Sequence, residues 1–280
     1  MRSVDVARVT DAVREMCIEV NHKLSPDMAG KFAEAQKREE SPLGRQILGQ
    51  LIENMEIART EMIPICQDTG MAVVFVEVGQ DVHFEGGNIE DAINEGVRRG
   101  YTEGYLRKSV VRDPLERVNT GDNTPAVIHY SIVPGEQVKL TLAPKGFGSE
   151  NMSRVFMLKP AQGIEGVKEA VLTAVADAGP NACPPMVVGV GIGGTFEKCA
   201  LLAKKALTRD VNVRSQIPYV AELETELLDK INDLGLGPGG LGGRVTALNV
   251  AVETYPTHIA GLPVAVNICC HVNRHISRVL

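Results

Sequence analysis

The chain has 280 residues, 44% of them hydrophobic, and carries 29 Lys and Arg against 35 Asp and Glu, a formal net charge of −6. A negative chain with only 4% aromatic residues lacks both the clustered positive charge and the stacking platforms of nucleic-acid binders. Its length fits one large domain or two modest ones, with enough apolar residues for a buried core.

The beginning of the chain mixes charged and apolar residues and lacks the apolar stretch of a signal peptide. No apolar run approaches the roughly 18 residues of a membrane span. We therefore expect a cytoplasmic protein with no membrane contact, in which thiols stay reduced. Its six cysteines then indicate buried thiols or metal ligands rather than a disulfide framework.

The first sixty residues carry helical signals. Apolar residues recur there at spacings of three and four, at Val6, Val9, Val13, Met16 and Val20. Ser-Pro pairs at residues 25–26 and 41–42 each place a hydroxyl at a helix cap and a proline at the first helical position. We predict three helices over residues 1–60.

From residue 71 the pattern alternates between strands and helices. β-branched and apolar runs predict strands over 71–78, 126–133, 137–144, 186–190, 247–254 and 264–268. Helices are expected over 88–107, 163–178, 195–207 and 219–234. Pro134-Gly135 makes residues 126–144 a hairpin candidate. The predicted fold class is mixed α/β (α+β): a helical segment, residues 1–60, packed on a mixed-sheet core, residues 61–280, as one compact unit.

Two of the cysteines have ordinary core surroundings. Cys17 lies beside the apolar stripe of the first predicted helix, and Cys199 lies among alanines and leucines. Both are best interpreted as small core residues.

The other four cysteines, Cys66, Cys183, Cys269 and Cys270, end strand-like or apolar segments, and no two of them have Cys-x-x-Cys spacing. Adjacent residues of a strand point to opposite faces, so at most one of Cys269 and Cys270 can serve a shared site. Spacing alone is compatible with unrelated buried thiols. The neighbouring Gln-Asp-Thr-Gly, Pro-Pro and His instead favour a site in a cleft.

Three thiolates would suit a particular cofactor. A [4Fe–4S] cluster has four irons, so three cysteine ligands leave one iron open as a Lewis acid. Lewis-acid chemistry on a hydroxyl leaving group is dehydration.

The sequence resembles the class I, iron–sulfur-dependent fumarate hydratases and L-tartrate dehydratases, specifically the α subunit of the two-subunit form. The resemblance lies in Ile-Cys-Gln-Asp-Thr-Gly at 65–70, Asn-Thr-Gly-Asp-Asn-Thr-Pro at 119–125, Pro-Lys-Gly-Phe-Gly-Ser-Glu-Asn-Met at 144–152, Cys-Pro-Pro at 183–185, Val-Gly-Val-Gly-Ile-Gly-Gly-Thr at 188–195, Thr-His-Ile-Ala-Gly-Leu-Pro at 257–263 and Val-Asn-Ile-Cys-Cys-His at 266–271. These pieces run in family order over about three quarters of the chain.

The resemblance implies roles for individual residues. The ligands of a [4Fe–4S] cluster would be Cys66, Cys183 and Cys270. The catalytic candidates are Asp68, in a base relay, and His258, pointing into the cavity for proton delivery. The substrate-binding candidates are Gln67, Arg107, Asn119, Thr120, Gly121, Asp122, Gly146 and Gly148. Phe147 departs from the family pattern, which often has glycine there, and so affects the expected substrate contacts.

Several of these residues also have plainer interpretations. Residues 68–70 and 121–125 could be simple turns, and His258 could be a core histidine. The glycines at 189–194 lack the spacing of a dinucleotide loop. We expect them to allow close backbone approach to the cluster, with the helix start at Thr195 offering N–H groups to an anion.

The function expected from the resemblance is reversible hydration of fumarate, a small dicarboxylate, to L-malate. A separate β subunit would complete the active site, and α–α contacts are expected as well. The alternatives are the α subunit of an L-tartrate dehydratase, which shares the chemistry, a noncatalytic metal- or cluster-binding subunit, and a dinucleotide-dependent enzyme.

Overall fold

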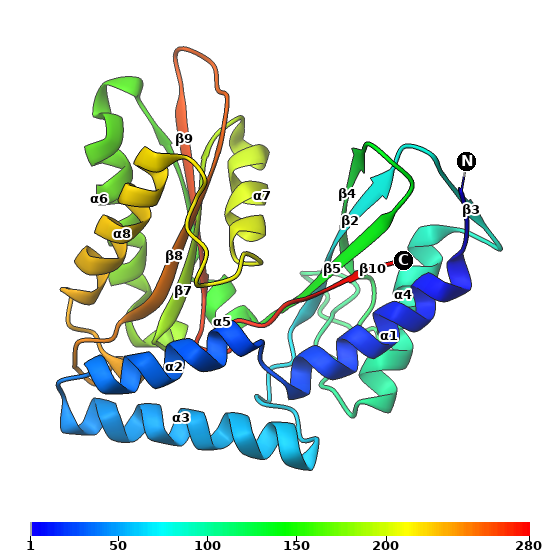
Figure 1. The fold of residues 1–280 in the computed structure, drawn as a ribbon, viewed down its shortest axis with the longest axis horizontal. Helices are drawn as coiled ribbons and strands as arrows, with labels where there is room; N and C mark the ends of the chain where they lie inside the picture. The colour runs from blue at the N-terminus through cyan, green and yellow to red at the C-terminus, as the bar shows by residue number, and fades with distance from the viewer. Residues whose placement is uncertain (1) are drawn as a thin grey trace. The chain divides into compact units, whose positions relative to one another are not determined.

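A computed structural model describes residues 2–280. The chain forms two compact units (Figure 1). Unit 1 comprises the residues up to Ser25, Met55–Phe147 and Arg274–Leu280, and unit 2 comprises Pro26–Asn54 and Gly148–Asn273. Among the described residues, no helix has both the length and the apolar character needed to cross a membrane.

Unit 1 is built on a four-stranded mixed sheet in the order β10-β5-β2-β4. Its strands are β2 (Met71–Gly79), β4 (Val127–Val133), β5 (Val138–Lys145) and β10 (Ile276–Val279). β5 pairs antiparallel with β2 and β10, whereas β4 pairs parallel with β2. A separate parallel pair joins β1 (Arg2–Asp5) to β3 (Val82–Glu85).

Helices α1 (Val6–His22) and α4 (Ile89–Glu103) pack on each other and contribute, with the sheet, to one apolar core. Their close approach depends on glycine. A Cβ at Gly96 would lie 2.7 Å from the Thr10 carbonyl oxygen, and one at Gly100 would lie 2.6 Å from the Cβ of Cys17. Side-chain caps begin both helices: Asp5 accepts the Ala7 N–H, and Asn88 accepts two N–H groups of the first turn of α4.

Unit 2 contains a second four-stranded mixed sheet, in the order β6-β9-β7-β8. Its strands are β6 (Arg154–Leu158), β7 (Met186–Gly193), β8 (Ala247–Tyr255) and β9 (Leu262–Cys269). α6 (Gly163–Ala178) and α8 (Pro218–Asn232) cover one face, and α7 (Phe196–Ala206) covers the other (Figure 1). β7 and β8 are parallel, while β9 runs antiparallel to β7 and β6.

The remaining helices are α2 (Pro26–Arg38), α3 (Pro42–Glu61), the short α5 (Phe147–Glu150) and the 3-10 turns η1 (Pro160–Gln162), η2 (Gly179–Ala182) and η3 (Pro238–Gly240). The carboxylate of Glu39, fully buried in unit 2 between α2 and α3, accepts the N–H groups of Glu40, Ser41, Arg244 and Val245. Burial raises the pKa of Glu39, but these four backbone hydrogen bonds outweigh it and lower the pKa below its usual value.

The mixed α/β class is confirmed, as are the three opening helices and each predicted strand and helix as an element. The hairpin prediction for residues 126–144 is wrong. β4 and β5 do not pair, because β2 lies between them and hydrogen-bonds to both. β2 is almost continuously buried, as expected of a central strand, and β4 is left at the sheet edge. The helix expected to reach residue 107 ends at Glu103, before Gly104.

The division at residue 60 does not coincide with the two units. α1 belongs to unit 1 because it packs on α4 and β5, whereas α2 belongs to unit 2 and contacts β8. The short strands β1, β3, β6 and β10 were not predicted. Each has only four or five residues, too few for a clear alternating pattern.

Candidate functional site

The turn formed by residues 66–70 connects α3 to β2 in unit 1. It begins after Ile65, whose N–H donates to the Asn21 carbonyl, 2.9 Å away. Cys66 is half-buried, and its sulfur accepts the Asp68 N–H over 3.4 Å. Gly70 has a φ of 75°, and a Cβ there would lie 2.7 Å from the Lys145 backbone. The turn is thus built for a close approach to the end of β5, which only glycine permits.

The carboxylate of Asp68 is held by two backbone groups. Oδ1 accepts the Gly70 N–H over 3.0 Å, and Oδ2 accepts the Phe147 N–H over 2.9 Å. A Cβ at Gly146 would lie 3.0 Å from Oδ2, so a side chain at that position would press on the carboxylate. Phe147, where relatives often have glycine, contributes its N–H to the site while its ring is half-exposed.

Buried side chains hold the rest of the turn. The hydroxyl of Tyr101 donates to the carbonyls of Thr69, at 2.8 Å, and Gly70, at 3.1 Å. The Asn123 amide donates to the Gly70 carbonyl over 3.1 Å, and Arg274 donates to the Asp68 carbonyl. All three residues are at least 96% buried.

Thr69 fixes the predicted substrate-binding residue Arg107 beside this turn. Its hydroxyl accepts the Arg107 N–H over 2.9 Å and donates to the Arg107 carbonyl over 3.2 Å. The side chains of Gln67 and Arg107 are exposed. The structure therefore places Gln67 and Asp68 on one turn and joins Arg107, from the segment after α4, to that turn through the Thr69 hydroxyl.

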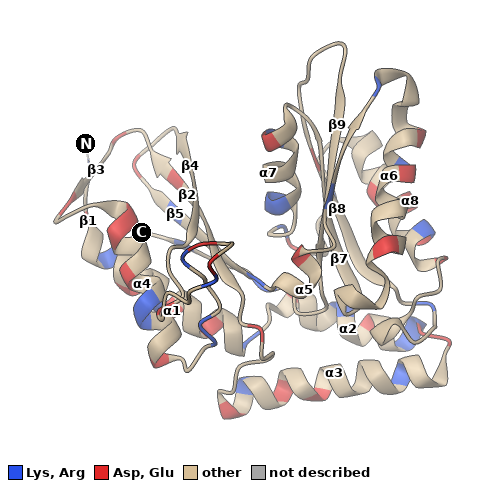
Figure 2. Cartoon of the chain, turned by 180° about the vertical axis from the view of Figure 1, so that it is seen from behind, with Lys and Arg blue, Asp and Glu red and all other residues tan. Residues whose placement is uncertain are grey.

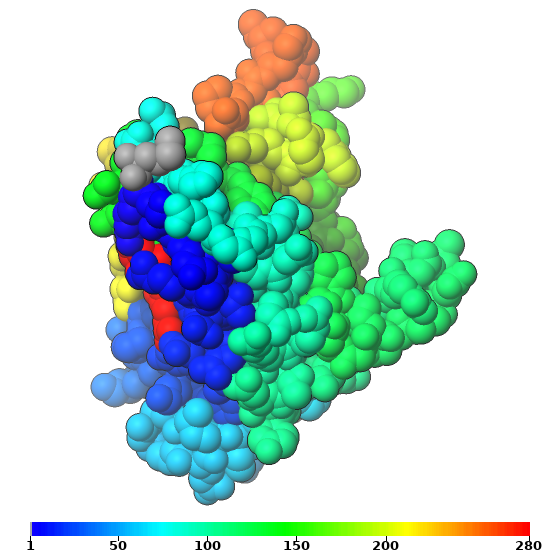
Figure 3. Space-filling model, turned by 90° about the vertical axis from the view of Figure 1, so that its right-hand side faces the viewer, coloured from blue at the N-terminus to red at the C-terminus, as the bar shows by residue number. Residues whose placement is uncertain are grey.

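The segment between α4 and β4 stands out from unit 1 as an arm (Figure 3). An isolated bridge joins Val111 to Asn119, and Asn119 also donates to the Lys108 carbonyl and accepts the Gly121 N–H. The Thr120 N–H donates to Val110. Basic and acidic residues interleave along this arm (Figure 2). The end of the arm carries Asn119, Thr120 and Gly121. Bonds to Lys108 and Val110 hold it beside the start of the arm, which follows Arg107.

Asp122 is engaged by its neighbours. Partial burial raises the pKa of its carboxyl, but hydrogen bonds from Thr124 and Arg98 outweigh burial and lower the pKa from 3.8 to about 2. Oδ1 accepts both the hydroxyl and the N–H of Thr124, and Oδ2 accepts Nε of Arg98. Through these bonds Asp122 stabilises the segment that leads into β4 and links it to Arg98 on α4.

Cys183 and Cys270 lie together in unit 2. His271 donates to the Cys183 carbonyl both from its N–H, at 3.3 Å, and from Nδ1, at 3.0 Å. Cys183 follows η2 in a left-handed conformation, with φ 52°, and two prolines separate it from β7, while Cys270 directly follows β9. Because β7 and β9 are antiparallel neighbours, the start of one meets the end of the other. Gly148 belongs to the same unit, and a Cβ there would lie 3.9 Å from the carbonyl of Asn181.

The six cysteines fall into two classes by accessibility, and none forms a disulfide. Cys17, Cys199 and Cys269 are buried, and burial raises the thiol pKa of Cys17 and Cys199. Cys183 is exposed, and Cys66 and Cys270 are half-buried. Within residues 2–280, no three His, Cys, Asp or Glu side chains are gathered closely enough to hold a metal ion. In type and accessibility, however, Cys66, Cys183 and Cys270 fit the soft thiolate donors that an iron–sulfur cluster requires.

His258 lies at the opposite end of the unit 2 sheet from Cys183 and Cys270. It occupies the exposed loop between β8 and β9, beside Gly194, which follows β7. β9 runs from Leu262 to Cys269, and seven steps of roughly 3.3 Å give about 23 Å between its ends. Nδ1 of His258 accepts the Ala260 N–H over 3.2 Å. The structure thus does not bring His258 to the two cysteines of its own unit.

Gly189 and Gly191 of β7 serve packing against α7, and not the expected approach to a cluster. A Cβ at Gly189 would lie 2.2 Å from the Ala203 carbonyl oxygen, and one at Gly191 would lie 2.0 Å from that of Cys199. Gly193 and Gly194 fall at the end of β7 remote from Cys183. The small residues let a helix lie directly on the strand.

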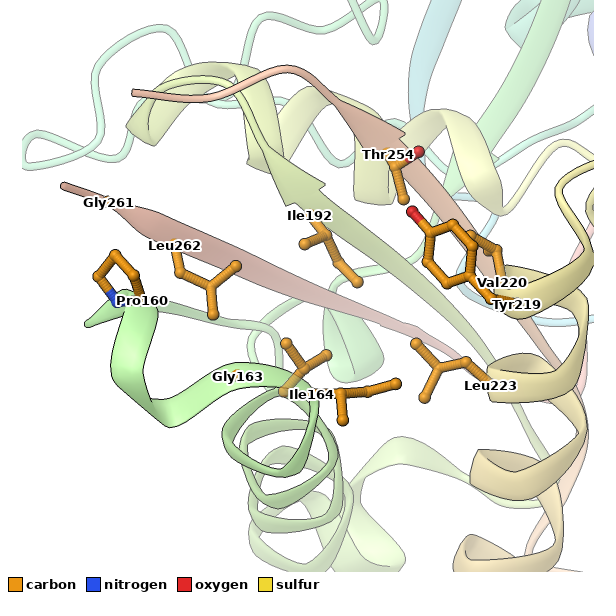
Figure 4. Close-up of a pocket in the computed structure, with 11 residues that line it drawn as sticks. Pro160, Gly163, Ile164, Ile192, Tyr219, Val220, Leu223, Thr254, Gly261 and Leu262 are labelled. Carbon is orange, nitrogen blue, oxygen red and sulfur yellow. The ribbon is translucent and has the colours of Figure 1, made fainter. Parts of the chain in front are cut away.

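An apolar pocket of about 300 Å³ lies between α6, α8 and the sheet of unit 2 (Figure 4). Ile164, Ile192, Tyr219 and Leu223 are among the residues that line it. None of the predicted site residues lines it, so it is separate from the cysteines and from Asp68.

Sequence reasoning missed three residues that hold the site: Tyr101, Asn123 and Arg274. Asn123 offered a signal, because asparagine in a Gly-Asp-Asn-Thr-Pro run is suited to its left-handed conformation, with φ 64°. Tyr101 and Arg274 offered none, since their partners are 31 or more positions away in sequence.

Comparison with known proteins gives the family. A family model described as Fumarate hydratase (Fumerase) matches residues 10–279. The chain belongs to this fumarate hydratase family. It is 42% identical, over 273 residues, to the putative L(+)-tartrate dehydratase subunit alpha of Methanocaldococcus jannaschii, with 95% of each chain covered.

A second relative of this fumarate hydratase family member is the L(+)-tartrate dehydratase subunit alpha of Escherichia coli strain UTI89. It is 32% identical over 273 residues, which cover 96% of this chain and 89% of the relative. The resemblance seen in the sequence is confirmed, and the chain is a hydro-lyase subunit.

Proposed function

We propose that this chain is the α subunit of a hydro-lyase that interconverts fumarate and L-malate. The observation that carries the proposal is the fixed Asp68 carboxylate, which shares a turn with Cys66, while the backbone of Arg107 is hydrogen-bonded to Thr69 of the same turn. A hydro-lyase that uses an iron–sulfur cluster needs a cluster ligand, a proton-transfer group and a cation for the substrate carboxylate close together. The turn supplies the first two, Cys66 and Asp68, and the adjoining segment supplies the cation, Arg107.

Cys66, Cys183 and Cys270 are the residues proposed to hold a [4Fe–4S] cluster. They are the accessible thiols of the chain, while the other three are buried. Such a cluster with three cysteine ligands supplies a Lewis-acidic iron.

Asp68 is proposed as the proton-transfer group of a base relay. An ionised carboxylate has about four acceptor positions, and backbone N–H groups take two of them here. The two bonds fix the plane of the carboxylate and leave acceptor positions for a proton of the substrate. Arg107, with Gln67 and the 119–122 segment, is proposed to bind the substrate dicarboxylate, for which a guanidinium offers two parallel donors.

His258 is proposed to deliver a proton, and its position favours action on a second copy of the chain. Because Nδ1 accepts the Ala260 N–H, the neutral ring carries its proton on Nε2, where it can be donated. A group bound by Cys183 and Cys270 lies at their end of the sheet, about 23 Å from the other end of β9. The proposed α–α contacts would therefore bring His258 of one copy to the site of another.

The subunit names of the relatives support a separate partner, and we propose a β subunit that contributes further substrate-binding groups. The named relatives also favour a second candidate, L-tartrate dehydration, which would use the same residues on a substrate with one more hydroxyl.

An adjacent pair of cysteines gives a matched test. The assembled enzyme, purified without oxygen, should contain iron and hydrate fumarate, and Cys270→Ser should lose both iron and activity. Cys269→Ser, at the buried neighbour, should keep both. Comparing fumarate, L-malate and L-tartrate as substrates assigns the reaction. Full activity of Cys270→Ser would favour a noncatalytic metal-binding role for the cysteines and refute the cluster assignment.

Mixing inactive variants tests whether His258 acts between copies. Cys183→Ser lacks a cluster ligand but keeps His258, and His258→Asn has the reverse defect. For dimers formed at random from equal amounts, half are mixed and one of their two sites is intact, so about a quarter of the wild-type activity should return. If no activity returns while dimers exchange, His258 serves its own chain, and if His258→Asn is active by itself, His258 serves no site.

A further inference from the structure

Arg274 is a buried cation at the start of the last segment of unit 1. The residue is only 4% exposed, and its Nη2 donates to the carbonyl of Asp68. Nε and Nη1 are buried with no hydrogen-bond acceptor among residues 2–280. A buried guanidinium with two unsatisfied nitrogens is costly, and such a group calls for a specific explanation.

The bond from Arg274 completes the set of contacts on Asp68. The N–H of Asp68 donates to the Cys66 sulfur, and its carboxylate accepts from Gly70 and Phe147. The remaining polar group is the carbonyl, which Arg274 holds. Of these contacts on the main chain and side chain of Asp68, only the one from Arg274 comes from a charged side chain.

The charges of Arg274 and Asp68 both act on the same buried hydroxyl. Burial raises the pKa of Tyr101 well above its usual value, with Arg274 lowering it and Asp68 raising it. Tyr101 in turn donates to Thr69 and Gly70, the two residues after Asp68. The guanidinium therefore belongs to the network that surrounds the turn rather than to a distant ion pair.

We propose that Arg274 is a positioning residue for the hydro-lyase reaction. Arg274 holds the carbonyl of the peptide between Asp68 and Thr69. It thereby fixes the orientation of this peptide plane in the turn that carries Cys66, and with it the direction of the Asp68 carboxylate. The catalytic part of this inference rests on the proposed role of Asp68. In the sequence Arg274 follows Cys270, a proposed cluster ligand, by four residues. The same segment therefore carries Cys270 and the side chain that holds the turn of Cys66, another proposed ligand.

The first measurement is amide hydrogen exchange of the full chain without substrate, which does not depend on the proposed reaction. Arg274→Met keeps much of the apolar stem and removes the charge and the donors. Exchange at Asp68, Thr69 and Gly70 should accelerate about tenfold, the effect of losing one hydrogen bond. Exchange within α4 should stay unchanged.

The second measurement uses the assembled enzyme. Arg274→Met should lower kcat about a hundredfold, as expected for a small misplacement of a reacting group, while KM changes less than threefold. Arg274→Lys keeps a donor and the charge and should recover part of kcat. A merely structural role would instead lower the amount of folded enzyme and leave kcat per folded site unchanged.

Arg278→Met is the matched control, since Arg278 lies four positions later and pairs with Glu15 and Glu19 on α1. It should leave both exchange at residues 68–70 and kcat unchanged. Unchanged exchange in Arg274→Met would overturn the inference, whatever reaction the enzyme performs. Accelerated exchange with unchanged kcat would keep the contact and refute its catalytic importance, and absence of hydro-lyase activity in the wild type would refute the proposed function alone.

Discussion

The main-chain N–H of Phe147 donates to Oδ2 of Asp68 over 2.9 Å, across 79 positions of the sequence. This bond ties the first residue of α5, two positions after the end of β5, to the turn that precedes β2. Because β2 and β5 are antiparallel neighbours with Met71 opposite Lys145, the two segments meet at the same sheet end. The position of the carboxylate is therefore set by the strand register.

Asp68→Asn keeps the shape of the side chain and removes its charge. We expect the activity of the assembled enzyme to fall by about 10²–10⁴-fold, the usual contribution of a general base. The amide NH₂ would also face a backbone N–H, so the free energy of unfolding should fall by about 1–3 kcal/mol. Steady-state kinetics and urea denaturation measure the two effects. Activity within threefold of wild type would exclude Asp68 from proton transfer.

Gly146→Ala tests the close approach to the carboxylate. The new Cβ would lie 3.0 Å from Oδ2 of Asp68, so the carboxylate or the backbone must shift. We expect kcat to fall about tenfold or more, because reacting groups tolerate little displacement. Gly30→Ala, in α2 with no atom within 4 Å of the new Cβ, is the control. It should leave kcat unchanged and raise stability by up to about 1 kcal/mol through helix propensity.

Thiol labelling tests the separation of the cysteines into two classes. In the native chain at neutral pH, iodoacetamide should modify Cys183 fastest, followed by Cys66 and Cys270. Cys17 and Cys199 should stay unmodified, because burial blocks access and raises the thiol pKa. Mass spectrometry after proteolysis reads out each site.

Loading the protein with iron and sulfide extends the labelling experiment. The three reactive cysteines should become protected together, because thiolates that bind iron are not available for alkylation. Protection of a different set, or of one cysteine alone, would contradict the proposed ligands.

Stability at acidic pH should depend on Asp122. Its pKa in the folded chain, about 2, lies below the ordinary value of 3.8, so its stabilising contribution is fully present above pH 3.8. The contribution is lost as the pH falls from there towards 2, and we expect about 1–2 kcal/mol. Urea denaturation at several pH values measures it, and Asp122→Asn should remove this part of the pH dependence. An unchanged pH dependence in that variant would assign the loss to other carboxyls.

Much of the fold was predictable because it depends on local patterns. The helix starts at Pro26 and Pro42, the Asn88 cap and the long apolar run of β2 are signals within a few residues. The order of strands was not predictable in this way. β4 and β5 are adjacent in sequence and separated by one turn, yet β2 lies between them, since its two buried faces make it the central strand.

The candidate site shows the same limit. Cys66 and Asp68 were predicted from a motif and Arg107 from the family resemblance, and the bond between Thr69 and Arg107 agrees with their grouping. His258 was found from a motif as well, but only the antiparallel course of β9 places it at the far end from Cys183 and Cys270. A motif specifies residue types along the chain and carries no information on which end of a sheet they reach.

By itself, the sequence determined the family, the mixed α/β class and which cysteines have polar or turn-forming neighbours. Each of these depends on short patterns of residues that are close together in the chain. Only the tertiary structure decided which thiols are accessible and which side chains hold the turn at Asp68. Tyr101, Asn123 and Arg274 meet that turn from three separate segments. Such meetings follow from burial and strand register, which depend on contacts between distant residues.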